Sequence, residues 1–326
     1  MILNVVLVVI AFAILIKGAD FFVTGASSMA RKMGITPFVV GLTVVAIGTS
    51  APEFFVNVIA AFGGSTDLAI GNVIGSNVAN ILLGLGVASV VATIAIKKQT
   101  VWKEIPFALL SALVIAFVTL DTVFSGAQIN TISRGDGLTL LCFFVIFMVY
   151  TFGLSKVKEG DKESDHIDVY SWTKSIILTV GGIGALLIGG DMVVHNAVAI
   201  ALSLGWSENL IGLTIVAMGT SLPEIVTSVI AVRKKQADLV VGGIIGSTIF
   251  NAFFILGSTA LVKDIVIAPH KQLDITFDTL FLLVISTAFF IFMFVGKKHS
   301  LERWQGVLFI TTYLLYMAYA IMREMN

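Results

Sequence analysis

The chain has 326 residues, of which 57% are hydrophobic and only 12% are charged. A soluble domain of this size needs a much higher surface density of charge, so this composition excludes a soluble fold. The formal net charge is zero, and the Lys and Arg residues fall in short clusters between apolar runs. We therefore expect no nucleic-acid partner, because no basic stripe is available to follow phosphates. The sequence predicts an all-α protein whose main partner is the lipid bilayer.

Ten apolar segments are long enough to cross the hydrocarbon layer, which takes about 20 residues of helix. Polar or Gly-rich breaks separate these segments along the chain. The first and sixth exceed what a perpendicular helix needs, so we expect them to tilt. The expected spans are residues 2–30, 37–62, 67–91, 104–120, 136–154, 171–204, 208–232, 238–261, 273–295 and 303–322.

The basic residues predict how the chain is oriented. Fifteen Lys and Arg residues lie in the loops that follow odd-numbered spans, and four lie in the other loops and at the chain ends. Short loops rich in Lys and Arg stay in the cytoplasm. We therefore expect a multi-pass protein of the plasma or inner cell membrane, with both termini outside and residues 154–170 forming a cytoplasmic linker.

An internal repeat appears when the sequence is compared with itself at an offset of 171 positions. Residues 41–86 and 212–257 align without gaps and share 22 identities in 46 positions. Duplication of a five-helix unit explains this match. The chain accordingly divides into a first repeat, residues 1–153, and a second repeat, residues 171–326.

Five spans per unit place the second copy in the membrane from the face opposite to the first. The two copies are then related by a pseudo-two-fold axis in the bilayer plane, an arrangement typical of secondary transporters. We expect ten transmembrane helices in two inverted five-helix repeats, with broken helices at mid-membrane.

Each repeat carries the motif Gly-Thr-Ser-x-Pro-Glu in the middle of a span, as GTSAPE at 48–53 and GTSLPE at 219–224. Glycine and proline there predict a broken helix. One interpretation is a capping box, in which Ser50 or Ser221 restarts the helix with the glutamate three residues later. The other is an ion site, since a carboxylate at mid-membrane costs about 2.5 kcal/mol or more and is paired or functional.

The polar residues of the repeats share helix faces. Ser50 lies three residues before Glu53, and Ser76 lies four before Asn80. The second repeat repeats both spacings with Ser221, Glu224, Ser247 and Asn251. Together these side chains predict a ring of hard oxygens, which suits Ca²⁺ with its 6 to 8 oxygen ligands and subsets of which suit Na⁺. The absence of nearby His or Cys argues against zinc, copper or iron.

The doubled motif, GTSxPE followed by GNVIGSNVAN or GGIIGSTIFN, resembles the sodium/calcium exchanger branch of the cation/calcium antiporter superfamily, and the resemblance covers essentially the whole chain. It implies an inverted five-plus-five arrangement in which the first and sixth spans are gating helices. It also implies a ligand set of Glu53, Glu224, Thr49, Thr220, Ser50, Ser221, Ser76, Ser247, Asn80, Asn251 and the carbonyls of Ala46 and Ala217.

The resemblance also implies a coupling ion. Potassium-dependent exchangers of this superfamily carry an aspartate where this chain has Asn251, and the GNxxE element of proton/calcium exchangers is absent from both halves. We expect exchange of Na⁺ for Ca²⁺ by a prokaryotic, potassium-independent type. We expect no further cofactor, no obligatory protein partner and no enzymatic activity, since no nucleophile and base or zinc motif accompanies the glutamates. Proton- or potassium-coupled antiport and a passive cation channel remain as alternatives.

Two further acidic residues lie at matching places of the repeats. Asp20 and Asp191 stand 171 positions apart, in the first and sixth spans. We expect them to act as buried hydrogen-bonding groups between helices, and direct contact with an ion is the alternative.

Overall fold

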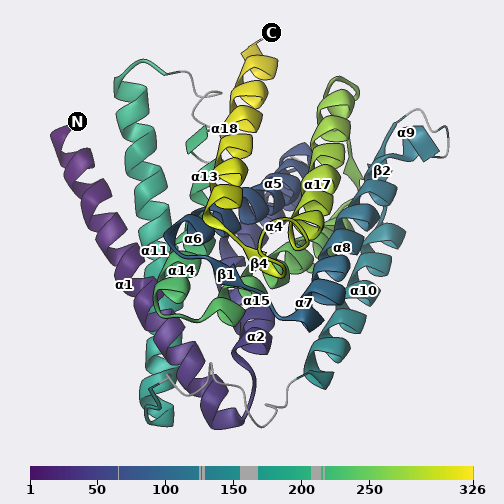
Figure 1. Cartoon of the computed structure of the whole chain (residues 1–326). Coiled ribbons are helices and arrows are strands. Elements are labelled where there is room, and N and C mark those ends of the chain that lie inside the picture. Colours follow the sequence, from purple (N-terminus) through teal and green to yellow (C-terminus); the bar gives the residue numbers. More distant parts are fainter. Residues whose placement is uncertain are drawn as a thin grey trace.

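The computed structural model describes residues 1–64, 66–124, 126, 129–154, 168–206, 214–215 and 217–325 (Figure 1). Almost all of this part of the chain is helical. The α-helices are α1 (Ile2–Met33), α2 (Pro37–Val40), α3 (Ala46–Thr49), α4 (Ala51–Gly63), α5 (Thr66–Ala79), α6 (Gly86–Val91), α7 (Lys98–Trp102), α8 (Glu104–Thr119), α9 (Asp121–Phe124), α10 (Arg134–Gly153), α11 (Trp172–Ser203), α13 (Ala217–Gly219), α14 (Leu222–Arg233), α15 (Ala237–Ile249), α16 (Leu256–Val262), α17 (Gln272–Phe292) and α18 (Arg303–Met325).

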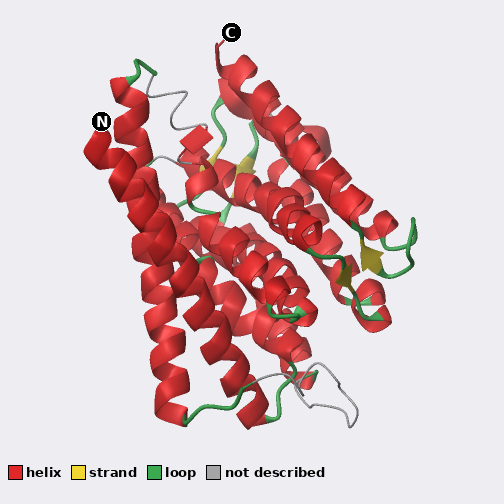
Figure 2. Ribbon diagram, turned by 60° about the vertical axis from the view of Figure 1, so that its left-hand side comes forward, coloured by secondary structure: helices red, strands yellow, loops and turns green. Residues whose placement is uncertain are grey.

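Three π-helical turns join some of these helices end to end: η1 (Gly41–Val45), η2 (Asn80–Leu85) and η5 (Phe250–Ile255). A short 3₁₀ turn, η6 (Pro269–Lys271), precedes α17. Two small antiparallel sheets (yellow in Figure 2) pair β1 (Ile94–Ala95) with β4 (Ser300–Leu301) and β2 (Thr131–Ile132) with β3 (Ile265–Val266). Each sheet therefore links a segment of the first repeat to one of the second.

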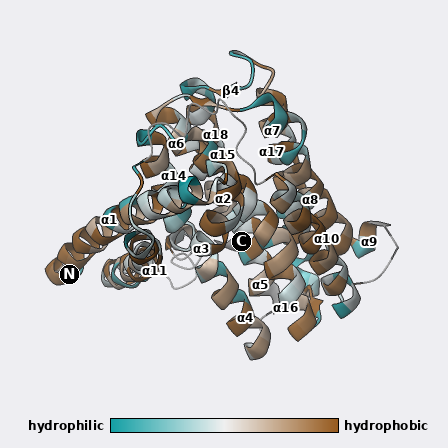
Figure 3. Cartoon of the chain, turned by 90° about the horizontal axis from the view of Figure 1, so that it is seen from below, coloured by the Kyte–Doolittle hydropathy of each residue, from teal (hydrophilic) through white to brown (hydrophobic). Residues whose placement is uncertain are grey.

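Eight helices of the described residues are long and apolar enough to cross a membrane. A ninth candidate is the bent pair Pro37–Thr49 and Ala51–Gly63, whose axes differ by 47°. These nine overlap nine of the ten expected spans. The remaining one, 208–232, includes residues outside the described part and contributes α13 and α14. Most of the helical ribbon has the colour of hydrophobic residues (brown in Figure 3), and together with these spans this confirms a multi-pass membrane protein.

Burial separates inner from outer helices. Of the most apolar stretch in Ala237–Val262, 94% of residues are buried, and in Leu68–Val91 the fraction is 83%. In α1 it is only 22%. The third segment of each repeat therefore lies at the centre of the molecule, whereas α1 lies toward the outside.

The second segment owes its shape to local sequence. Pro52 lies in the first turn of α4, where a missing backbone N–H costs nothing because that group has no intrahelical partner. Gly64 ends the helix at φ 83°, a left-handed conformation that a glycine adopts without strain. Proline and glycine thus set both ends of the helix that carries Glu53.

The long helices α1 and α11 pack side by side in opposite directions. Gly18 abuts Ala185, whereas Gly182 abuts Phe22, so rising numbers on one helix meet falling numbers on the other. A Cβ placed at Gly182 would lie 2.5 Å from the backbone N of Phe22. Small residues at such contacts allow membrane helices to approach backbone to backbone, where dispersion forces are strongest.

Asp20 and Asp191 differ from each other in this structure. Asp20 forms an ion pair with Lys234 at 2.6 Å, which ties α1 to the turn between α14 and α15. A hydrogen bond from Ser27 to Gln236, 2.6 Å long, supports the same contact. Asp191 is exposed, so our expectation of a buried hydrogen-bonding role for it is wrong. The repeat offset pairs Lys234 with Gly63, and this glycine offers no ammonium group to Asp191.

The contact between α1 and α11 provides a direct test of this packing. Gly182→Ala should lower the stability of the purified protein by about 1 to 3 kcal/mol, because the new methyl group overlaps the α1 backbone. Gly181→Ala is the matched control, since a Cβ there meets no atom within 4 Å. Thermal unfolding in detergent measures both. Equal effects of the two substitutions would contradict the packing described.

Candidate functional site

The two Gly-Thr-Ser-x-Pro-Glu motifs form equivalent breaks. Ser50 separates α3 from α4 with φ −84° and ψ 10°, and Ser221 precedes α14 with φ −85° and ψ 0°. The glycine that opens each motif lies against the surrounding long helices. A Cβ on Gly48 would lie 3.1 Å from Ile183, and one on Gly219 would lie 2.0 Å from Val194. The motifs thus combine a helix break with a close contact to α11.

The capping-box interpretation of these serines is wrong. Neither Ser50 nor Ser221 makes a side-chain capping hydrogen bond at the start of its helix. The Ser50 hydroxyl instead donates to Glu224 Oε1 at 3.1 Å, which connects the break of the first repeat to the glutamate of the second.

Both glutamates are buried, Glu53 at 1% and Glu224 at 3% exposure. The Ser76 hydroxyl lies 3.5 Å from Glu53 Oε1, and Thr220 of the other repeat lies beside the same carboxylate. Thr49 lies beside Glu224, and the two carboxylates are close enough to interact electrostatically. Among the described residues no Lys or Arg pairs with either glutamate. The centre thus holds two acidic groups that face hydroxyls of both repeats.

The serine of the second repeat that corresponds to Ser76 completes this arrangement. Ser247 lies 3.4 Å from the Thr49 hydroxyl and 3.5 Å from the Ala46 carbonyl oxygen. Asn80 opens the π-helical turn η2, and Asn251 lies in the turn η5. A π-helical turn displaces side chains and is frequent at functional sites. Ala217, the remaining predicted ligand, is the first residue of α13.

Several buried oxygens of this cluster have no hydrogen-bond partner within the described protein. All are oxygen atoms, the hard type of ligand, and two come from the first repeat and four from the second. They are Glu53 Oε2, Glu224 Oε2, Thr220 Oγ1, Ser221 Oγ, Asn80 Oδ1 and Asn251 Oδ1. Buried polar atoms normally have partners, so a set of free acceptors is suited to a cation of the Ca²⁺ or Na⁺ type.

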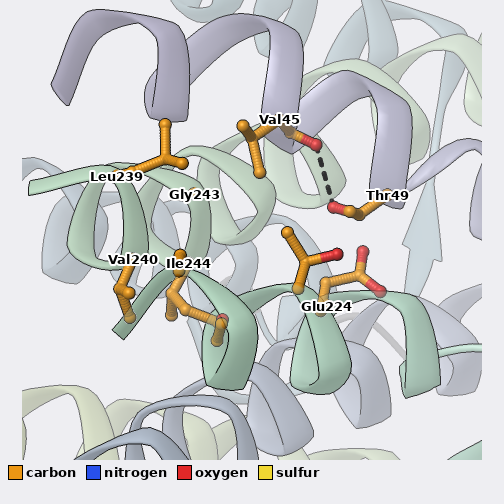
Figure 4. Close-up of a pocket in the computed structure, with 10 residues that line it drawn as sticks. Val45, Thr49, Glu224, Leu239, Val240, Gly243 and Ile244 are labelled. Carbon is orange, nitrogen blue, oxygen red and sulfur yellow. Dashed lines mark hydrogen bonds between the residues drawn. The ribbon is translucent and has the colours of Figure 1, made fainter. Parts of the chain in front are cut away.

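A small cavity of about 10 Å³ adjoins Glu224. Figure 4 shows Thr49 and Glu224 facing it from different helices, with the Thr49 hydroxyl bonded to Val45 O at 3.0 Å. Thr227 and Ser228 also line this space, and Leu239, Val240 and Ile244 supply apolar walls. The cavity extends the polar centre along α14.

Sequence reasoning missed Asn77, which fixes how Asn251 presents its amide. Asn77 Nδ2 donates to the backbone carbonyl of Thr248 at 3.2 Å, and Asn251 Nδ2 donates to Asn77 Oδ1 at 3.1 Å. A carbonyl only accepts, so this contact orients Asn77, and Asn77 in turn orients Asn251. Asn251 Oδ1 must then point away from Asn77. Its position next to Ser76 in the sequence could have marked Asn77 as a candidate. Its function in orienting Asn251 was not predictable, because it depends on a contact between the repeats.

The fold and the site define a polytopic membrane protein with two related halves that meet at a buried acidic centre. The chain matches the family model described as "Sodium/calcium exchanger protein" over residues 3–153 and 174–322. It belongs to this family, as the doubled motif predicted.

Relatives of nearly equal length support this membership. The putative antiporter CaxA of Alkalimonas amylolytica is 35% identical, with 97% of this chain and 98% of the relative aligned. The sodium/calcium exchanger MaX1 of Methanosarcina acetivorans is 29% identical over 96% and 97% of the two chains. A solved structure of the sodium-calcium exchanger NCX_Mj, soaked with Na⁺ and Sr²⁺, matches with a TM-score of 0.82 and 30% identity, covering 97% of this chain and 98% of that one.

The buried carboxylates predict a stability effect. Glu53→Gln should raise the stability of protein purified in a chelator by about 1 to 3 kcal/mol, because it removes one of two neighbouring buried charges and preserves side-chain shape. Asp191→Asn serves as control, since this exposed group should change stability by about 0.5 kcal/mol or less. Thermal unfolding is the measurement. A loss of stability in Glu53→Gln would indicate that this carboxylate serves the fold.

Proposed function

We propose that this protein is a secondary active antiporter that exchanges Na⁺ for Ca²⁺ across the membrane. The observation that carries the proposal is the pair of buried glutamates, each lying beside a hydroxyl of the opposite repeat. Membership of the sodium/calcium exchanger family supports it, as do the names of the relatives.

The charge of the centre supports the exchange of Na⁺ for Ca²⁺. Two ionised glutamates give a charge of minus two, which one Ca²⁺ neutralises and which several Na⁺ neutralise in its place. Hydroxyl, amide and carbonyl oxygens then complete the coordination that hard cations prefer. Glu53 and Glu224 are the shared ligands in this proposal, and the other ten predicted ligands serve each ion in different subsets.

Alternating access follows from the cost of an uncompensated charge. An empty centre of charge minus two is costly to close off from water in a low-dielectric interior, whereas a neutralised centre is not. We propose that α1 and α11 move only when the centre is neutralised, as parts of ten helices in two inverted repeats. Their antiparallel contact through glycines supports sliding, because the facing atoms nearest to Gly18 and Gly182 are backbone atoms and the Cβ of Ala185.

The orientation remains part of the proposal: both termini outside, and the linker between repeats in the cytoplasm. In Figure 1 both chain ends lie at the upper end, while α10 ends and α11 begins at the lower end. Residues 155–167 of the linker lie outside the described part. The excess of Lys and Arg in loops of the linker end supports a cytoplasmic location for that end and placement in the cell membrane.

Asn251 supports coupling to Na⁺ without K⁺. Its amide is neutral and its nitrogen is bound to Asn77, so it offers the centre one uncharged oxygen. Coupling to protons or potassium is the closest alternative. A passive channel is the alternative of another class, and the helix breaks in both repeats favour alternating access over a continuous pore. Further cofactors, an obligatory protein partner and enzymatic activity have no part in this proposal.

Flux measurements test the proposal. Purified protein in proteoliposomes should take up ⁴⁵Ca²⁺ when an outward Na⁺ gradient is imposed, and neither a pH gradient nor a K⁺ gradient should replace it. Glu53→Gln and Glu224→Gln should each reduce this uptake to the level of empty liposomes, because a single remaining charge does not balance Ca²⁺. Asp191→Asn should retain wild-type uptake. Ca²⁺ flux that needs no counter-ion would favour a channel.

Asn77 gives a second prediction within the same function. Asn77→Thr, the residue that the second repeat carries at Thr248, removes the anchor of Asn251. Partners that orient metal ligands typically contribute 10- to 100-fold to affinity. We expect the half-saturating Ca²⁺ concentration to rise by about tenfold. Asn196→Ser is the control, because the hydrogen bond that the Asn196 amide makes within the described part of the chain stays in its own helix, at Met192. An unchanged half-saturation value would show that Asn251 needs no anchor.

A further inference from the structure

The hairpin of α4 and α5 carries polar residues beyond the centre. Ser76 lies opposite Glu53, and this contact sets the antiparallel register of the two helices. One turn nearer to the connection between them, Asn57 stands four residues after Glu53 and Asn72 four residues before Ser76. Residues four apart share a helix face, so Asn57 and Asn72 face each other across the hairpin. They form a second polar pair on the same face as the centre.

Asn57 is fully buried, and neither its Oδ1 nor its Nδ2 has a partner within the described protein. Asn72 Nδ2 is also without a partner there. A buried polar group left unpaired costs about 1 to 3 kcal/mol. The Asn57 side chain makes no hydrogen bond to the described residues, so a contribution to a bound species explains its burial better than a structural role.

The second repeat does not share this feature. The offset of 171 places Ser228 at the position of Asn57 and Gly243 at that of Asn72. Both line the small cavity beside Glu224, so the two positions face the same space in their repeat. Figure 4 shows Gly243 and Glu224 in this region. The first repeat thus has two amide side chains where the second repeat has a serine hydroxyl and a glycine without a side chain.

The two pairs lie toward opposite ends of the molecule. The chain ends lie at the upper end of Figure 1, and α4 and α5 lie above α2 in that view. Gly64, which follows α4, lies near Lys263, whereas the turn after α14 contacts the second half of α1 through Lys234. The Asn57 pair therefore lies between the centre and the end that holds both termini, and the Ser228 pair lies toward the linker.

We propose that Asn57 and Asn72 form an additional coordination site for Na⁺, between Glu53 and the terminal end of the protein, which the opposite route lacks. The site rests on the proposed function. Amide oxygens are neutral, and Ca²⁺ affinity depends strongly on the number of charged ligands, so a pair of amides suits a monovalent cation. The site binds Na⁺ one helical turn from the carboxylates. Its presence on one side only makes the apparent affinity for Na⁺ differ between the two faces of the protein.

The test compares Na⁺ dependence on the two faces. Everted and right-side-out membrane vesicles present opposite faces of the protein, and Na⁺-dependent ⁴⁵Ca²⁺ flux in each gives a half-saturating Na⁺ concentration. Asn57→Ser, the residue of the second repeat, should raise this concentration three- to tenfold on the terminal face. On the linker face it should change less than twofold. Asn196→Ser, on α11, should leave both faces unchanged.

A second variant tests the site even if Asn57→Ser fails to fold. Asn57→Asp keeps the shape and adds a charged oxygen, so it should lower the half-saturating Na⁺ concentration on the terminal face. Equal shifts on both faces, or no shift in either variant, would overturn the proposed site. Absence of Na⁺-dependent flux in the wild-type protein would instead overturn the proposed function itself.

Discussion

Two carboxylates buried side by side, without a basic partner among the described residues, set the main constraint on this structure. Such charges are costly in a low-dielectric interior unless polar groups surround them. The surrounding groups come from both repeats: Ser50 bonds to Glu224, and Thr220 lies beside Glu53. Neither repeat completes this environment alone. The stability of the centre therefore depends on how the two halves are held together.

Backbone irregularity places these groups. A helix break at Ser50 frees its hydroxyl from a capping role, and the π-helical turn that begins at Asn80 shifts the side chains that follow. Regular helices in the same positions would satisfy their own hydrogen bonds and present fewer free oxygens. Glycines at the breaks let α11 cover them closely, so the irregular backbone lies inside the protein and away from lipid, as a membrane interior requires.

Much of this was predictable from the sequence. Hydropathy predicted the membrane spans because helix length and bilayer thickness constrain each other, and the repeat predicted that Glu53 and Glu224 are equivalent. Contacts that depend on tertiary register were not predictable. The partner of Ser50, the anchoring function of Asn77 and the exposure of Asp191 all depend on which helix faces which. The capping-box alternative failed for the same reason, since spacing along the chain does not show that a hydroxyl has a closer partner in the other repeat.

The symmetry of the repeats is strong at the centre and weak away from it. Glu53 and Glu224 correspond, but the ion pair of Asp20 with Lys234 has no equivalent, because the matching positions hold Asp191 and Gly63. If the repeats were identical, exchanging their conformations would give two states of equal free energy. An ion pair present at one end only removes that equality. In the proposed cycle, opening the linker end requires α1 to separate from Lys234, whereas at the terminal end Asp191 of α11 forms no ion pair with the described residues. In that cycle the resting conformation depends on residues outside the centre, even though the proposed exchange of ions takes place within it.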